Sequence, residues 1–365
     1  MIPLFRVNMA ETVDAPLLEC LHSGYIGQGK AVDKFEADLA AFIGNPRVLT
    51  TNSGTSALHL ALHMIGVEGK HVITTALTCT ATNWPIISNG GKILWADIEG
   101  SSPNISVRSV EKLLEEYRGT VAAVMVVHWG GSPVDIEGIN QAAAKYGVPV
   151  IEDSAHALGS EYHGQKIGNH SRFVCFSFQA IKHLTTVDGG LICLSSNDDY
   201  QRAKLLRWYG IDRDSARADL RCEDDVLEAG FKFHMNDVCA TIGCENLKLI
   251  PAILEQSQAV AAFYSQHLAN MPGVRLMSDP PNTRSSYWLY TIAVENRDGF
   301  MRHMKDCGVM TSKVHARNDL HTCVKEFVRP LPVLDAFTKQ MVCIPASCSL
   351  EEAKHVVDCI KRGWS

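Results

Sequence analysis

The sequence predicts an α/β protein in which helices cover both faces of a mostly parallel central sheet, followed by a smaller α+β domain. Between residues 45 and 195, short apolar runs alternate with segments of helical periodicity. Strands that alternate with helices in this way favour a parallel sheet. After about residue 247 the pattern changes to one long amphipathic segment and then mixed elements. We therefore predict a large domain at residues 1–247 and a small domain at residues 248–365.

The strands are predicted from apolar runs that are rich in Val and Ile and bounded by Gly or Asp. Such runs lie at residues 71–75, 92–96, 121–127 and 148–152, with two further strands at 173–178 and 190–195. Apolar residues at helical spacing predict the helices between them, at 55–65 and 136–146. In the small domain we expect a long helix over 251–271, an element at 287–294, and helices over 297–307 and 350–362.

Composition and charge exclude several classes of protein. A net charge of -6 and a pI of about 6.2 give no support for nucleic-acid binding. The 12 cysteines contain no C-x-x-C pair and no zinc spacing, so no metal site is predicted. The N-terminal segment has no apolar core, and the longest apolar run, residues 121–127, is too short to span a membrane. We expect a cytoplasmic protein with reduced thiols that binds neither nucleic acid nor a membrane.

A run of small hydroxyl residues with a glycine, residues 50–58, leads directly into the first predicted helix of the sheet. Free backbone N–H groups and the positive end of the helix dipole make such a start suitable for binding a phosphate group. Taken alone, the same residues are explained more simply as an ordinary N-cap.

Two acids stand at the carboxyl end of the fourth predicted strand: Glu152 is its last residue, and Asp153 follows directly. Ligands of an open parallel sheet bind at the carboxyl ends of its strands, so one of these carboxylates is a candidate binding group. Their side chains point to opposite sides of an extended chain, so only one is expected to serve the site. The alternative is that Asp153 only caps the turn that follows.

Lys182 lies in an apolar and hydroxyl-rich segment between two predicted strands. A desolvated lysine has a lowered pKa and becomes a nucleophile toward carbonyl groups. The alternative is a surface lysine that extends its ammonium into water. A phosphate-binding helix start, then an acid after a strand, then a lysine, is the ordered set of groups that holds pyridoxal phosphate. The combination therefore predicts this cofactor.

At these residues the sequence resembles the DegT/DnrJ/EryC1/StrS family of pyridoxal-phosphate-dependent sugar aminotransferases. The resemblance covers nearly the whole chain in ordered motifs, at residues 2–4, 23–29, 35–36, 53–58, 127–131, 152–156, 189–190, 331–332 and 344–345. It implies the type I fold of these transferases, which is like that of aspartate aminotransferase, and a homodimer with shared active sites. It also implies that an amino acid, with glutamate expected, gives its amino group to a keto sugar through pyridoxamine phosphate.

The resemblance assigns roles to the residues at matching positions. Lys182 would bond the cofactor and move protons, and Asp153 would contact the pyridine nitrogen. His156 stands where the family usually has glutamine, near the 3-hydroxyl of the ring. The phosphate would be held by the amides of Gly54 and Thr55 and by the hydroxyl of Ser177.

Two positions depart from the family pattern, and a third bears on the type of reaction. Cys79 stands where the family often has an aromatic residue over the cofactor ring. Lys232 replaces an asparagine that reaches the phosphate in the neighbouring subunit, and a lysine can still serve a phosphate. His183 follows Lys182. Dehydratases of the family carry histidine in place of the lysine, whereas here the lysine itself aligns, which favours transamination.

The small domain offers His315, Arg317 and His321 for binding a diphosphate or a carboxylate, and an exposed polar loop is the alternative. The expected substrate is a nucleotide-linked 4-keto-6-deoxysugar, the commonest class in the family. A 3-keto sugar and a free acidic sugar such as an 8-oxo octulosonate remain open. The rival functions are a sugar dehydratase, disfavoured by Lys182, and a non-catalytic scaffold, disfavoured because Lys182 and Asp153 are both intact.

Overall fold

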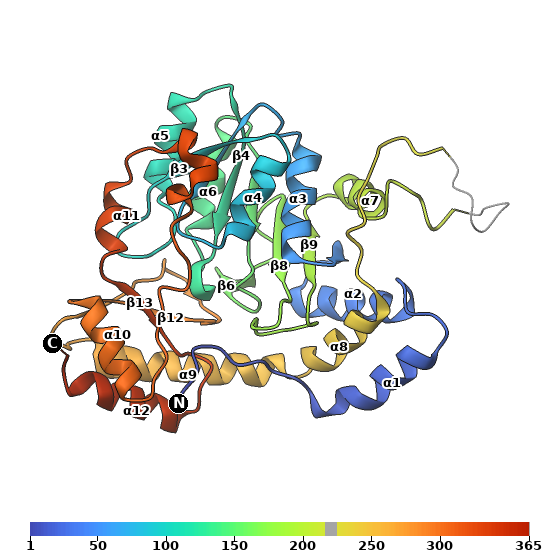
Figure 1. Cartoon of the computed structure of the whole chain (residues 1–365). Coiled ribbons are helices and arrows are strands. Elements are labelled where there is room, and N and C mark those ends of the chain that lie inside the picture. Colours follow the sequence, from blue (N-terminus) through green and yellow to red (C-terminus); the bar gives the residue numbers. More distant parts are fainter. Residues whose placement is uncertain (216–224, 365) are drawn as a thin grey trace.

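A seven-stranded sheet forms the centre of the computed structural model, which describes residues 1–215 and 225–364 (Figure 1). Its strand order is β1-β9-β8-β5-β4-β2-β3. All neighbouring pairs from β3 to β8 are parallel, whereas β9 is antiparallel to both β8 and β1. The predicted mostly parallel sheet is therefore confirmed. The strands are β1 (Val48–Thr51), β2 (His71–Thr75), β3 (Lys92–Ala96), β4 (Val121–Val127), β5 (Val150–Asp153), β8 (Phe173–Ser177) and β9 (Gly190–Leu194).

Both faces of the sheet are buried, as the continuous apolar runs predict. Along β4, Ala123 and Met125 pack into one apolar cluster, and Val124 and Val126 pack into another on the opposite face. The first cluster includes α3 (Gly54–Ile65), α4 (Thr80–Ser88) and α7 (Asn197–Leu206). The second includes α2 (Lys30–Ile43), α5 (Val107–Glu116), α6 (Ile136–Ala144) and α8 (Asp237–Leu247). Sequence analysis missed β1, which pairs with β9 at the edge of the sheet.

A third apolar cluster is built mostly from the part of the chain after residue 247. It joins α9 (Ile250–Leu268) to α10 (Arg297–Asp306), α12 (Leu350–Lys361) and a small antiparallel sheet. That sheet has the order β10-β12-β13, with β10 (Val274–Leu276), β12 (Tyr290–Val294) and β13 (Met341–Ile344). The other α-helices and strands of the described residues are α1 (Asp14–His22), α11 (Pro332–Phe337) and a sheet of β6 (Glu161–Tyr162), β7 (Gln165–Lys166) and β11 (Thr283–Arg284). Short 3-10 helices lie at Glu11–Val13, Trp129–Gly131, Asn318–Leu320 and Thr322–Phe327. The domain boundary at residue 247 falls between α8 and α9 and stays a prediction.

Near the start of the chain, Ile2 packs in this third cluster, whereas Leu4 belongs to the first cluster on the large sheet. The N–H of Ile2 donates to the oxygen of Gly308 at 2.7 Å, and the N–H of Met310 donates back to Ile2 at 3.0 Å. The N-terminus accordingly lies beside α9 and α12 (Figure 1). In the described ranges, no helix is long and apolar enough to cross a membrane.

Candidate active site

A cavity of about 380 Å³ lies where the carboxyl ends of β5 and β8 meet the N-termini of α3 and α4. This volume is within the usual range for sites that bind small molecules. Its walls come from both sides of the predicted boundary, since Trp288 and His315 follow residue 247. The predicted residues that line it are Gly54, Thr55, Cys79, Asp153, His156, Ser177, Lys182 and His315.

The start of α3 forms one end of the cavity. Ser53 caps the helix by accepting the N–H of Ser56 at 3.0 Å, so the helix begins at Gly54. A Cβ on Gly54 would lie 2.9 Å from the Cβ of Ser177, and a Cβ on Gly190 would lie 2.5 Å from the nitrogen of Gly54. Only glycine permits these approaches. The first N–H groups of a helix have no partner within it, so this helix start fits a phosphate group.

Asp153 ends β5 and projects into the cavity, with 5% of the residue exposed. Its carboxylate accepts the hydroxyl of Thr82 at 2.7 Å and the N–H of Ala155 at 3.0 Å. Burial raises the pKa of Asp153, and these two hydrogen bonds oppose the rise because they stabilise the ionised form. The carboxylate therefore has fixed donors on one side and faces the cavity on the other, as a partner of a pyridine nitrogen requires.

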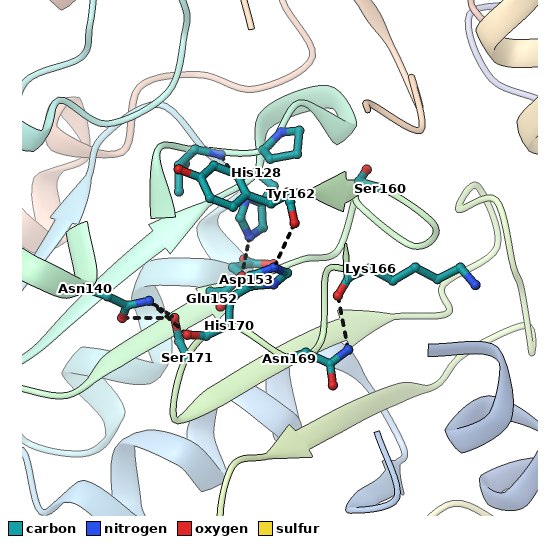
Figure 2. Close-up of polar contacts among 12 residues, drawn as sticks. His128, Asn140, Glu152, Asp153, Ser160, Tyr162, Lys166, Asn169, His170 and Ser171 are labelled. Atoms are coloured by element: carbon teal, nitrogen blue, oxygen red, sulfur yellow. Dashed lines mark hydrogen bonds and ion pairs between the residues drawn. The ribbon is translucent and has the colours of Figure 1, made fainter. Parts of the chain in front are cut away.

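Glu152 points away from the cavity, as the alternation of side chains along a strand predicts. Figure 2 shows it with His128, the residue that follows β4. Both are fully buried, and Nε2 of His128 lies 2.8 Å from Oε2 of Glu152. Nδ1 of His128 accepts the N–H of Val134 at 3.1 Å, so Nε2 carries the ring proton and donates it to Glu152. This pair links the ends of β4 and β5 behind Asp153.

Lys182 lies between β8 and β9 and reaches into the cavity. Burial lowers its pKa to about 8, while the charges of Asp153 and Cys79 act in the opposite direction. Much more of the free amine is present near neutral pH than for an ordinary lysine. The sequence-based expectation of a desolvated, nucleophilic lysine matches this environment.

Three histidines surround Lys182 and carry no charge at neutral pH. Burial and the lysine charge lower the pKa of His183 and of His315 to about 4, and they lower that of His156 well below its usual value. Nδ1 of His156 accepts the N–H of Gly130 at 3.3 Å, so its Nε2 carries the proton. His156 can therefore donate a hydrogen bond from Nε2 to an oxygen of a ligand in the cavity. Nε2 of His315 is buried without a hydrogen-bond partner in the described structure, which leaves it available to a ligand.

Three predicted site residues lie outside the cavity lining. Lys232 is exposed, and its carbonyl oxygen accepts the side-chain amide of Asn52 at 3.1 Å. Arg317 binds Asp319 through Nε and Nη2, at 3.0 and 2.6 Å, and binds Asp335 through Nη1. His321 packs edge-on against Trp84, with ring centroids 5.6 Å apart. In this structure the guanidinium of Arg317 is thus occupied by carboxylates of its own chain.

The sequence analysis did not assign roles to Thr82, Phe5 and Trp288, which also line the cavity. Thr82 is the second residue after Thr80, where α4 begins, and its hydroxyl reaches Asp153 across the end of the sheet. Phe5 and Trp288 stack on each other with ring centroids 4.8 Å apart. Trp288 lies in the element predicted at 287–294, but no periodic pattern indicates that it contacts Lys182.

Comparison with known proteins identifies close similarities. The model of the DegT/DnrJ/EryC1/StrS aminotransferase family matches residues 8–361. The UDP-4-amino-4,6-dideoxy-N-acetyl-beta-L-altrosamine transaminase of Campylobacter jejuni (strain 81-176) is 32% identical over 292 residues, or 80% of this chain and 76% of that protein. The crystal structure of the sugar aminotransferase CalS13 from Micromonospora echinospora has 37% identity and a TM-score of 0.94, and the match covers 100% of both chains.

A more distant structure shares the fold and is known with and without an amino group on its cofactor. The putative sugar aminotransferase Spr1654 from Streptococcus pneumoniae is 23% identical and was solved in a PLP-form and a PMP-form, with TM-scores of 0.89 and 0.91. The match covers 99% of this chain and 98% of that chain. These similarities agree with the expected type I transferase fold.

Proposed function

The chain belongs to the DegT/DnrJ/EryC1/StrS aminotransferase family, and from that premise we propose which sugar it aminates and which residues act. It is a sugar aminotransferase, and its cofactor is pyridoxal phosphate. Its proposed reaction moves the amino group of glutamate to a nucleotide-linked 4-keto-6-deoxysugar. The Campylobacter relative, whose name contains a 4-amino-4,6-dideoxy sugar linked to UDP, supports this class of substrate.

Different cavity residues are proposed to bind different parts of the cofactor. When bound, pyridoxal phosphate supplies an electron sink for the carbon that exchanges the amino group. We propose that the amides of Gly54 and Thr55, with the hydroxyl of Ser177, bind its phosphate, and that Asp153 pairs with its ring nitrogen. His156 donates from Nε2 to the ring oxygen, and Cys79 lies against the ring. Each of these residues lines the cavity, which supports the assignment.

Lys182 acts as the acid and base of the reaction. Its pKa of about 8 means that both the amine and the ammonium are populated near neutral pH, so Nζ can take up a proton from the substrate carbon and return it. A group whose pKa lies near the working pH is best suited to both steps. The neighbouring histidines have pKa values too low to compete for this proton at neutral pH.

One observation carries the choice of sugar: Arg317 is paired with two carboxylates of its own chain. A free acidic sugar would need a cation in the cavity, and Arg317 would have to leave Asp319, which is 2% exposed and would keep a buried charge. The neutral histidines and Trp288 suit an uncharged sugar ring instead. We therefore favour a nucleotide-linked keto sugar over an 8-oxo octulosonate, and His315 with its free Nε2 as a contact for the ring. Arg317 and His321 do not line the cavity, so we assign neither of them a contact with the sugar ring.

The reaction can be followed by the absorbance of the cofactor. Adding glutamate to the purified enzyme should replace a band near ~420 nm by one near ~330 nm as the cofactor takes the amino group. Three keto sugars are then offered separately: a nucleotide-linked 4-keto-6-deoxysugar, a nucleotide-linked 3-keto sugar and an 8-oxo octulosonate. The first should restore the original band. Restoration by the octulosonate alone would refute the proposed substrate, and the Lys182→Arg variant, which should show neither change, is the control.

We also propose that the enzyme is a homodimer in which Lys232 of one subunit contacts the cofactor phosphate of the other. The exposed position of Lys232, away from the cavity of its own subunit, supports this arrangement. Mixing inactive Lys182→Ala subunits with weakened Lys232→Ala subunits should restore activity in mixed dimers, because one of their two sites is then intact. No recovery of activity, or a monomer in sedimentation velocity, would contradict the proposal.

The cytoplasmic location of the protein stays a prediction.

A further inference from the structure

The ammonium of Lys182 rests on an aromatic ring. Its Nζ lies 3.8 Å from the ring centroid of Trp288. Within the residues that the structure describes, Nζ makes no hydrogen bond or ion pair, so this ring is its direct contact. The face of an indole carries negative electrostatic potential and attracts a cation at this distance.

Trp288 is held so that its ring cannot follow the lysine. Trp288 is 2% exposed, and its Nε1 donates to the oxygen of Ile181 at 2.8 Å. His156 stacks on the ring with centroids 3.9 Å apart and planes 20° apart, and Phe5 stacks at 4.8 Å and 23°. The ring therefore presents a fixed surface to a flexible side chain.

We infer that Trp288 is a positioning residue for Lys182, holding its ammonium in the cavity whenever the lysine is not bonded to the cofactor. Lys182 would be in this state before it bonds the cofactor, and again whenever it is released from that bond. A flexible, hydrated lysine would leave the cavity for water. When its ammonium contacts the Trp288 ring, Lys182 stays in the cavity, where it can bond the cofactor again. This role goes beyond the proposed function, because it is the same for every sugar.

Other charged and titratable groups also affect the pKa of Lys182, and their effects must be distinguished from the effect of the Trp288 ring. The charge of Asp153 at the end of β5 and that of Cys79 at the start of α4 favour its protonated form. His156, His183 and His315 surround it, and Asp188 also lines the cavity. Substituting Trp288 leaves the chemical identity of these groups unchanged but removes the ring on which His156 stacks, so a second measurement that keeps the ring is also needed.

The test is the pH dependence of cofactor capture by the apo-enzyme, which needs no substrate and no turnover. The rate of covalent capture rises as Nζ loses its proton, with a midpoint at the pKa of Lys182, about 8 in the wild type. Trp288→Leu should lower this midpoint by about one pH unit, because a cation on an aromatic face is stabilised and one on an aliphatic side chain is not. Trp288→Phe should give an intermediate value. A purely structural role would lower the maximal rate and the melting temperature and would leave the midpoint in place or raise it, because water entering beside Lys182 relieves the burial that lowers its pKa.

Fluorinated tryptophans keep the protein folded and test the same point without a change of shape. Fluorine withdraws electron density from the ring, so each added fluorine should lower the midpoint further in the wild type. The chain has 6 tryptophans, and the Trp288→Phe variant grown on the same analogues controls for the other five. A midpoint that moves with fluorination only when Trp288 is present supports the inference. An unchanged or higher midpoint in both the fluorinated wild type and Trp288→Leu overturns it.

Discussion

Replacing Thr82 by valine tests whether the donors behind Asp153 keep its carboxylate ready for the cofactor. The hydroxyl of Thr82 lies 2.7 Å from Oδ2 of Asp153. Thr82 is 0% exposed and Asp153 is 5% exposed. Valine has nearly the same shape but cannot donate. A hydrogen bond to a buried charged group contributes about 1.5–3 kcal/mol. In the Thr82→Val variant, the ionised carboxylate of Asp153 therefore loses stabilisation of this size.

The loss should appear in cofactor affinity rather than in the stability of the apo-protein. Without cofactor, Asp153 can take up a proton and so avoid part of the free-energy cost of a buried charge that has lost a hydrogen bond. Pairing with the ring nitrogen of the cofactor, in contrast, requires the charged form of Asp153. A difference of about 1.4 kcal/mol is a factor of ten, so we expect the cofactor to bind roughly 10- to 100-fold more weakly. Titrating the apo-protein with pyridoxal phosphate and following tryptophan fluorescence measures this affinity.

Thr82→Ser is the matched control, because it keeps the hydroxyl and removes only a methyl group. It should bind the cofactor within about threefold of the wild type, since an exchange that conserves the hydrogen bond loses only packing. Two results would refute the reasoning. One is an unchanged affinity in Thr82→Val, and the other is an equal loss in Thr82→Ser, which would assign the effect to packing.

Three further predictions concern the phosphate site, the buried acid and the paired arginine. Gly54→Ala places a Cβ 2.9 Å from that of Ser177 and should weaken cofactor binding at least about tenfold in the same titration. Burial raises the pKa of Asp153, so its contribution to apo-protein stability is complete below the unfolded value of about 3.9 and is lost as the pH rises through the folded value. Asp153→Asn has no charge to bury, so its melting temperature minus that of the wild type should be larger at pH 8 than at pH 4. The same difference at both pH values would contradict this. Arg317→Gln leaves Asp319 buried without its partner and should lower the free energy of unfolding in urea by about 3 kcal/mol with cofactor affinity unchanged. Loss of sugar binding at unchanged stability would instead place Arg317 in the substrate site.

The features that sequence predicts best are those that depend on neighbours in the chain. The burial of β4 and β5 follows from their apolar runs, and the opposite directions of Glu152 and Asp153 follow from the geometry of a strand. The phosphate-binding helix start is also local, because the capping residue and the glycine belong to one turn. Lys182 was identified by its order along the chain relative to these groups and by family resemblance.

The contacts that sequence could not predict join segments that are far apart along the chain. Thr82 reaches Asp153, and Trp288 reaches Lys182, only because the sheet and the small domain bring them together. Arg317 illustrates the same point: an arginine in a polar segment suggests an anion-binding group, and in this structure two carboxylates of the same chain pair with it, so its role toward the substrate stays a prediction. Whether a charged side chain is free or paired depends on tertiary packing, which periodicity does not report.

The position of the N-terminal segment has a consequence for how the protein is made. Ile2 pairs with Gly308 and Met310, and Phe5 forms a wall of the cavity against Trp288. A ribosome adds residues in order, so this opening segment must wait, unpaired, until the small domain has emerged. The large sheet can assemble earlier from residues that are closer along the chain. Nascent chains therefore acquire a folded sheet before they acquire a complete cavity, and full cofactor retention is expected only after synthesis has passed residue 310.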